Sequence, residues 1–299
     1  MNGLSDFKRL ILSSKLSVLG LLLVSIFLLA AILYVGTGGK ITPYSPFAGN
    51  LQIANQPPDL THIFGTDFQG RDIFSRVIAA LPTDLGIPIL VVLLSSLIGV
   101  LLGFVAGYNR GLISEVILRI TDVFLAFPTI IIVLAVAATL GPSLLNAVLA
   151  IAFVWWPPYV RLVRGGVLEV ITEDFVAASK ALNSSFFYIM LKDIIPNILP
   201  TMIVYATIDL GTALLSLSTL GFLGVGIGPD SPELGSMVGA ITYNLYTYPW
   251  EGLIPAVIVM IIVASFSFLG DGVREVLDVN LQAHMVIKER LTGAIGRRG

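Results

Sequence analysis

Residues 85–107 read LGIPILVVLLSSLIGVLLGFVAG and contain no charged side chain. At a rise of about 1.5 Å per residue, a helix of this length would cross the roughly 30 Å of hydrocarbon in a bilayer. Gly99, Gly103 and Gly107 recur at intervals of four residues, which places them on one face of that helix. Small residues at this spacing let two membrane helices approach closely. We therefore expect a span whose glycine face packs against a second helix, with a pore-lining role as the alternative.

The composition of the whole chain indicates that lipid is its solvent. Of the 299 residues, 56% are hydrophobic and only 12% are charged, and the mean hydropathy is +0.93. Soluble domains carry about 25% charged residues. The runs that are long and apolar enough to span a bilayer are residues 16–36, 85–107, 116–140, 144–163, 199–222 and 252–270. We predict an all-α membrane protein with six transmembrane helices, and we expect the first run to be retained, because it is too long for a secretory signal.

The positive charges predict the orientation of the spans. If the N-terminus is cytoplasmic and the spans alternate, all but three of the 17 Lys and Arg residues lie inside; Lys40, Arg71 and Arg76 lie outside. We therefore expect a multi-pass protein of the cell membrane with both termini in the cytoplasm. The expected units are residues 1–84 (cytosolic tail, first span and external segment), 85–280 (a core of five spans) and 281–299 (cytosolic tail).

The composition also disfavours several classes of function. The chain has no cysteine, and its two histidines, His62 and His284, lie in different polar segments, so we expect no metal site. A net charge of −2 gives no electrostatic basis for binding nucleic acid. The sequence contains neither a G-x-x-x-x-G-K-[ST] phosphate loop nor an HExxH motif. We therefore expect no catalytic residues and no cofactor bound by this chain.

The polar segment at residues 172–200 reads TEDFVAASKALNSSFFYIMLKDIIPNILP and is predicted to fold as two short helices at the inner membrane surface. Thr172 has a side chain typical of a helix N-cap, so we expect the first helix to begin there. Asn183 tolerates a left-handed backbone conformation and is expected to end that helix. Ser184 or Ser185 is then expected to cap the second helix.

One face of the first predicted helix is apolar, because Phe175, Ala178 and Leu182 recur at helical spacing. The small side chains of Ala177, Ala178, Ser179 and Ala181 would let a partner approach the backbone of this helix closely. A connector between spans is normally short, so a loop of this length with its own caps and an apolar stripe suggests a docking site for a partner protein, with a simple connector as the alternative.

This loop resembles the conserved cytoplasmic loop of the permeases of binding-protein-dependent ABC importers. The family pattern is Glu-Ala-Ala, three residues, Gly, and then a Pro thirteen residues further on. Ala177-Ala178-Ser179, Asn183 and Pro196 stand at those places with the same spacing. The chain departs from the pattern at two of them, with Ala177 in place of the Glu and Asn183 in place of the Gly.

Six further blocks resemble the dipeptide, oligopeptide and nickel branch of this family, and in particular the shorter, second permease of a pair. In chain order they are HIFGTDFQGRDIFSRVI (62–78), RITDVFLAFP (119–128), WPPYVRLVRG (156–165), GFLGVGIGPDSPELG (221–235), PWEGLIPA (249–256) and FLGDGVREVLD (268–278). The chain departs from the branch at residues 81–83, where an Arg is frequent, and at Leu217, where a Glu is frequent.

The resemblance implies a type I ABC importer permease fold with a cytosolic coupling helix. It implies four kinds of partner: a homologous second permease, one or two cytosolic ABC ATPases that bind ATP and Mg, an extracytoplasmic solute-binding protein, and the bilayer. Small peptides are the solute implied first, with oligosaccharides and nickel chelates as alternatives. The residues implied for coupling to an ATPase are Phe175, Ala177, Ala178, Ser179, Lys180, Ala181, Leu182 and Asn183.

Asp209 lies about ten residues into the fifth predicted span, where a charged side chain is costly. It is our candidate for the translocation path, as a contact for a substrate amine or as the wall of a water-filled passage; a buried, hydrogen-bonded carboxyl is the equally weighted alternative. A secondary transporter that works alone is a more distant alternative, because it would need chains of intramembrane carboxylates or histidines.

Charged residues near the ends of the spans give two further sets of candidates. For an external gate or a contact with the binding protein, they are Asp67, Arg71, Asp72, Asp230 and Glu233. For Asp67, Arg71 and Asp72 the alternative is that local ion pairs among them stabilise the segment in which they lie. At the inner interface we expect an ion pair between Arg119 and Asp122, and we expect Arg161 and Arg164 to reach the lipid headgroups.

Overall fold

The computed structural model describes residues 14–109, 111–141, 143–225, 231–240 and 246–295, and beyond Glu275 it describes only the path of the last helix. Within these ranges the regular elements are helices, and one isolated bridge pairs Thr66 with Asp72. The elements are α2 (Lys15–Gly36), η1 (Leu51–Ile53), α3 (Ile73–Tyr108), α4 (Leu112–Ala126), α5 (Thr129–Leu140), α6 (Leu144–Trp155), α7 (Pro157–Val170), α8 (Asp174–Ala181), α9 (Phe186–Tyr188), η2 (Ile189–Ile194), α10 (Ile195–Phe222), α11 (Leu234–Gly239) and α12 (Trp250–Ile295).

Five helical stretches of the described chain are long and apolar enough to cross a membrane, and a bent pair of helices provides a sixth candidate. The five are Lys15–Gly36, Ile73–Tyr108, Leu144–Val170, Phe186–Phe222 and Trp250–Glu275. The predicted all-α membrane fold is thereby confirmed. The number of spans reaches the predicted six when the bent pair is taken as one span.

The third predicted span, 116–140, is not one straight helix. It consists of α4 and α5, which meet at an angle of 91°. The break lies at Phe127 and Pro128, whose ψ angles of 148° and 119° are extended rather than helical. Because the ring of a proline disfavours the helical conformation of the residue before it, Pro128 accounts for the break at this point.

Two helices extend beyond the bounds of the predicted apolar spans. The second span begins at Ile73 and not at residue 85, because the Asp72 side chain accepts a hydrogen bond from Ser75 N and caps α3. Polar residues such as Asp84 lower the mean hydropathy of the first turns of α3, so the hydropathy of the sequence did not indicate this part of the helix. The last helix, α12, continues to Ile295, so it runs through the predicted start of a separate C-terminal tail at residue 281.

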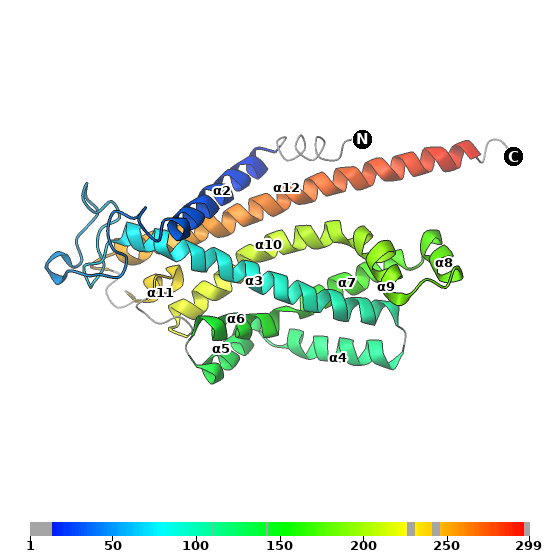
Figure 1. Ribbon diagram of the computed structural model, residues 1–299, viewed down its shortest axis with the longest axis horizontal. Helices are drawn as coiled ribbons and strands as arrows, with labels where there is room; N and C mark the ends of the chain where they lie inside the picture. Colours follow the sequence, from blue (N-terminus) through cyan, green and yellow to red (C-terminus); the bar gives the residue numbers. More distant parts are fainter. Residues whose placement is uncertain (1–13, 110, 142, 226–230, 241–245, 296–299) are drawn as a thin grey trace.

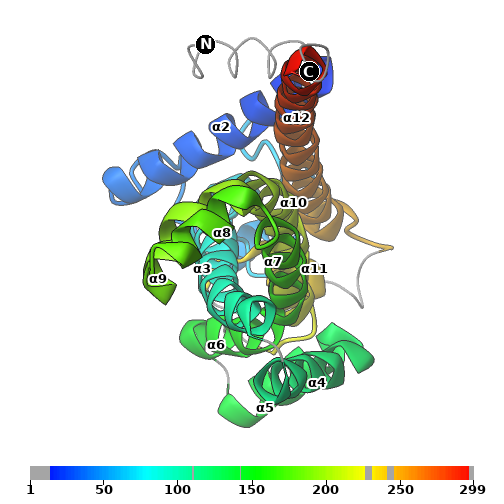
Figure 2. The ribbon, with the colours of Figure 1, turned by 90° about the vertical axis from the view of Figure 1, so that its right-hand side faces the viewer.

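The helices form an elongated bundle in which α3, α10 and α12 run along its length (Figure 1). The coupling loop with α8 lies at one end, and the segment between α2 and α3 lies at the other end, beside α11 (Figure 1). Seen along the bundle, α2 and α12 lie on one side, α4 and α5 lie on the opposite side, and α3, α7 and α10 lie between them (Figure 2). The two ends of the molecule therefore carry different candidate sites.

The glycine face of α3 packs directly on α7, as the spacing of its glycines predicts. A Cβ atom on Gly99 would collide with the Cβ of Tyr159. On Gly103 it would lie 2.8 Å from Val163 Cβ, and on Gly107 it would lie 2.7 Å from Val167 Cβ. Real side chains do not approach so closely, so only glycine permits this contact between the two helices at all three positions.

We expect Gly99→Val to destabilise the chain by about 1–3 kcal/mol or more, because the added methyl groups would force α3 away from Tyr159. Gly86→Val is the matched control, because Gly86 lies in the same helix, is exposed and has open space around its Cβ position. Thermal unfolding of the full chain in detergent checks both variants. Equal stability of the two would show that the glycine seam does not determine helix packing.

Candidate functional site

The predicted coupling helix, α8, is held by different capping residues than the sequence suggested. Its N-cap is Glu173, whose side chain makes no capping hydrogen bond, whereas the Thr172 hydroxyl donates 2.8 Å to Glu169 O at the end of α7. The prediction for Thr172 was therefore wrong. The predicted left-handed end is confirmed, since Asn183 has a φ of 55° and Ser184 N donates 3.0 Å to Ser179 O. Ser185 caps the next helix, as one of the two predicted serines.

One side of α8 is anchored and the rest is exposed. Val176 is fully buried, whereas Phe175 and Leu182 are 44% and 82% exposed, and Ala178 between them is also exposed. We call the exposed face formed by Phe175, Ala178 and Leu182 the coupling surface. Large apolar side chains in this position, at the end of the bundle and outside the spans, are typical of a surface that a partner covers.

The anchored side joins the coupling loop to three spans. Val176 packs in one apolar cluster with Val163 of α7 and Ile198 of α10. The ring of Phe186 contacts Phe104 and Tyr108 of α3, with centroid distances of 4.9 and 5.0 Å. The apolar cluster and the Phe186 ring therefore attach the loop that contains α8 to α3, α7 and α10.

Lys180 lies with its Nζ atom 5.4 Å from the centroid of the Tyr108 ring, at a distance typical of a cation–π contact. Its side chain therefore has a contact within the chain and adds to the attachment of α8 to α3. The predicted coupling residues Ala177 and Ala181 are exposed and Ser179 is partly exposed, so the structure leaves these small side chains accessible beside the coupling surface.

Asp209 is buried in the middle of α10 and is hydrogen-bonded to two aromatic side chains. Its Oδ2 atom accepts from Trp155 Nε1 at 2.9 Å and from the Tyr159 hydroxyl at 2.7 Å. The Tyr205 ring packs edge-on against Tyr159, with a centroid distance of 5.0 Å. Because Trp155 and Tyr159 lie on either side of the junction between α6 and α7, this carboxyl ties α10 to that junction. A role in the translocation path stays a prediction.

The external candidates Asp67, Arg71 and Asp72 are all buried. Arg71 Nε donates to Asp67 Oδ2 at 2.7 Å, and Asp72 Oδ1 lies 2.9 Å from His62 Nδ1. Arg76 Nη1 donates 2.9 Å to Pro46 O and so adds a contact to the folded external segment. The geometry matches the alternative of local ion pairs and leaves these residues little surface for a binding protein.

Glu233 is fully buried and caps α11, since its carboxylate accepts from Gly235 N at 2.8 Å and from Ser236 N at 2.6 Å. Burial raises the pKa of Glu233, while the Ser236 and Gly235 N–H groups act in the opposite direction. Asp84 of α3, a residue that the sequence reading did not select, accepts 3.1 Å from Leu234 N. The available signal was a carboxylate directly before an apolar run. The candidate Asp230 lies outside the described residues.

The inner ion pairs differ from the predicted ones. Arg119 pairs with Glu115 at 3.2 Å, and Asp122 pairs with Arg161 at 2.7 Å, so the expected pair of Arg119 with Asp122 was wrong. The Arg161–Asp122 pair joins α7 to α4, which are far apart in the sequence. Spacing along one helix could not reveal such a contact.

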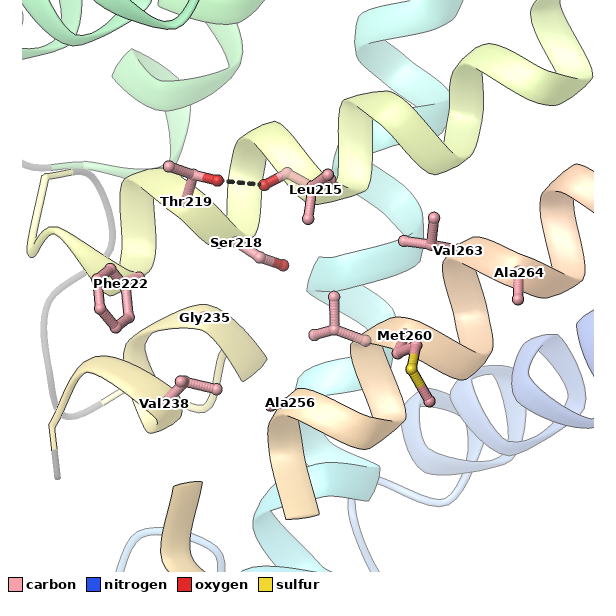
Figure 3. A pocket seen from close by; sticks show the side chains of 11 residues that line it. Leu215, Ser218, Thr219, Phe222, Gly235, Val238, Ala256, Met260, Val263 and Ala264 are labelled. Atoms are coloured by element: carbon pink, nitrogen blue, oxygen red, sulfur yellow. Dashed lines mark hydrogen bonds between the residues drawn. The ribbon is translucent and has the colours of Figure 1, made fainter. Parts of the chain in front are cut away.

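An apolar groove of about 510 Å³ lies between α10, α11 and α12 (Figure 3). Leu215, Phe222, Val238 and Met260 contribute side chains to its wall (Figure 3). The Thr219 hydroxyl donates 2.7 Å to Leu215 O and so is already bonded. The groove offers contact to apolar groups and few hydrogen-bonding partners for a polar solute.

Comparison with known proteins gives one family and several relatives. The model of the family described as "Binding-protein-dependent transport system inner membrane component" matches residues 99–282. A dipeptide transport system permease of Alkalihalophilus pseudofirmus is 38% identical over 277 residues, which cover 93% of this chain and 90% of the relative. A glutathione transport system permease of Escherichia coli O6:H1 is 36% identical over 228 residues, with coverage of 76% and 75%.

Solved structures show the same fold at lower identity. A methionine ABC transporter in an inward-facing conformation matches with a TM-score of 0.57 and 22% identity, over 68% of this chain and 97% of that chain. An amino acid ABC transporter matches with a TM-score of 0.52 and 18% identity, over 66% and 92%. These matches confirm the predicted type I importer permease fold for the helical bundle.

We expect Asp209→Ala to destabilise the chain by about 1–3 kcal/mol, because it leaves the buried donors of Trp155 and Tyr159 without an acceptor. Asp209→Asn keeps an acceptor oxygen at the same place and should cost clearly less. Thermal unfolding in detergent compares the two. Equal losses would show that the negative charge of Asp209, and not its role as acceptor, holds these helices.

Proposed function

This chain belongs to the family of binding-protein-dependent transport system inner membrane components, and from this premise we propose that it imports small peptides as one of two permeases in an ATP-driven complex. The family match covers most of the membrane core, and curated relatives at 36–38% identity are permeases for dipeptides and for glutathione. Their solutes share a peptide backbone, which favours peptides over oligosaccharides or nickel chelates here.

The observation that carries this proposal is the coupling surface. Phe175, Ala178 and Leu182 are exposed at one end of the bundle, while the other side of α8 is fixed to α3, α7 and α10. A transporter that works alone has no need of an exposed apolar lever on its cytoplasmic side. An ATPase that binds this surface and closes on ATP would move the attached spans together.

The division of labour follows from what this chain contains. Its sequence has no phosphate-binding loop of the G-x-x-x-x-G-K-[ST] type, so ATP and Mg would be bound by separate ATPase subunits. A homologous second permease would complete the translocation path, and a solute-binding protein would deliver the peptide to the outer end formed by the segment between α2 and α3 and by α11.

The orientation follows the same proposal. The start of α2 and the end of α12 point toward the end of the bundle that carries α8 (Figure 1). With α8 on the cytoplasmic side, the start of α2 and the end of α12 also face the cytoplasm, in agreement with the distribution of Lys and Arg.

Transport by the purified complex tests the function. The tagged chain is isolated from its native membrane, its partners are identified by mass spectrometry, and the complex is reconstituted in liposomes. We expect a second permease and ATPase subunits, and uptake of labelled dipeptide that needs both ATP and the binding protein. Competition by unlabelled dipeptide, glutathione, oligosaccharide and nickel chelate ranks the solutes. Uptake by this chain alone without ATP would contradict the proposal.

Leu182→Asp should remove most of the ATPase from the purified complex and most of the uptake, because it places a charge on the coupling surface at its most exposed large side chain. Since Leu182 is exposed, the permease itself should fold normally. Leu60→Asp is the matched control, because Leu60 is fully exposed at the opposite end of the molecule. The ATPase retained per permease is measured for both, and full retention by Leu182→Asp would contradict the assigned surface.

A further inference from the structure

A polar cavity of about 570 Å³ lies near the α8 end of the bundle, between the end of α3, the first turns of α4 and the second half of α7. Its polar lining residues are Asn109, Ser114, Glu115, Arg119, Asp122 and Arg164. Neither the coupling surface nor the proposed transport mechanism uses this cavity. Its charges come from two helices, so it is a place where a ligand could join α4 to α7.

Arg164 is the cation of this cavity that lacks a partner among the residues that the structure describes. Its Nε atom is buried and makes no hydrogen bond. By contrast, Arg119 and the neighbouring Arg161 are bonded to Glu115 and Asp122. Because both carboxylates already have partners, one positive charge remains for the cavity. A buried donor without an acceptor is unfavourable, so the site favours an anion.

The start of α4 adds to the positive potential. Gly111 is the N-cap of α4 and has no side chain to cap it, and both Gly111 and Ser114 line the cavity. The peptide dipoles of a helix place partial positive charge at its N-terminus. This contribution supports the charge of Arg164 and does not replace it.

An exposed apolar stripe runs along α4 beside these charges. Its members are 48–77% exposed and are Leu112, Ile113, Val116, Ile120 and Val123. At about 100° per residue, this stripe lies next to the face that carries Glu115, Arg119 and Asp122. A ligand with an anionic head and an apolar tail would satisfy both surfaces, whereas a small polar peptide would leave the stripe uncovered.

We propose that this cavity binds the phosphate group of an anionic phospholipid of the inner leaflet, with the acyl chains along the apolar stripe of α4. Arg164 holds the phosphate together with Arg119, whose ion pair with Glu115 is exposed to solvent and therefore weak. The choice of leaflet rests on the orientation given under the proposed function, because α7 leads directly into α8. The proposal does not depend on which solute the complex transports. The bound lipid stabilises the contact between α4 and α7.

The full chain, purified in detergent and stripped of lipid, is titrated with short-chain phosphatidylglycerol, and the thermal midpoint is followed. We expect a saturable rise that zwitterionic phosphatidylcholine does not match. Arg164→Gln should weaken the apparent affinity for phosphatidylglycerol roughly tenfold or more, because a charge-assisted contact is lost. Arg164→Lys keeps the charge and should retain most of the affinity. Lys192→Gln is the matched control, since Lys192 is exposed, lies toward the same end and does not line the cavity.

Equal weakening by Arg164→Gln and Lys192→Gln would overturn the site, because it would show a general attraction of anionic lipid to basic residues. Equal stabilisation by glycerol phosphate, or by an N-acetylated dipeptide, would overturn the assignment to lipid. If Arg164→Gln does not fold, Arg119→Gln is measured instead, with the same expected loss and the same control. These titrations need neither ATP nor uptake, so their failure and a failure of the transport function are distinguishable.

Discussion

The close approach of α3 and α7 is the contact on which the rest of the bundle depends. Lipid tails are as apolar as the side chains of these helices, so burial from water does not drive the helices together, and van der Waals contact must hold them. Gly99, Gly103 and Gly107 provide that contact because they place no side chain of their own against α7. Because α7 leads directly into α8, the contact of α7 with the glycine face of α3 also fixes the position of α8.

The coupling loop extends this packing beyond the spans. Val176 and Phe186 are its anchors, and they contact residues of α3, α7 and α10. The opposite face keeps Phe175 and Leu182 exposed, which gives no benefit to the chain by itself. An anchored side and an exposed apolar side are what a lever needs, because a partner can bind one side and move the spans that hold the other.

Several polar groups inside the bundle find partners on other helices, as a membrane interior favours. Asp209 receives two aromatic donors, and Asp84 accepts from the start of α11. The first two bonds join α10 to α6 and α7, and the third joins α3 to the start of α11. The charged pair of Arg161 and Asp122 does the same between α7 and α4. Within the described residues the buried Nε atom of Arg164 lacks such a partner, and its place at a polar cavity is what suggests a ligand.

The sequence by itself determined the membrane class, the approximate spans, a short helix in the 172–200 segment and the left-handed end of that helix at Asn183. Each of these depends on local hydrophobicity, spacing or backbone preference, and so is readable along the chain. Tertiary structure alone decided the 91° turn between α4 and α5 and the bonds of Asp209 to Trp155 and Tyr159. It also decided which side of α8 is buried. Contacts between distant residues arise only when helices pack, and no local pattern records which partners will meet.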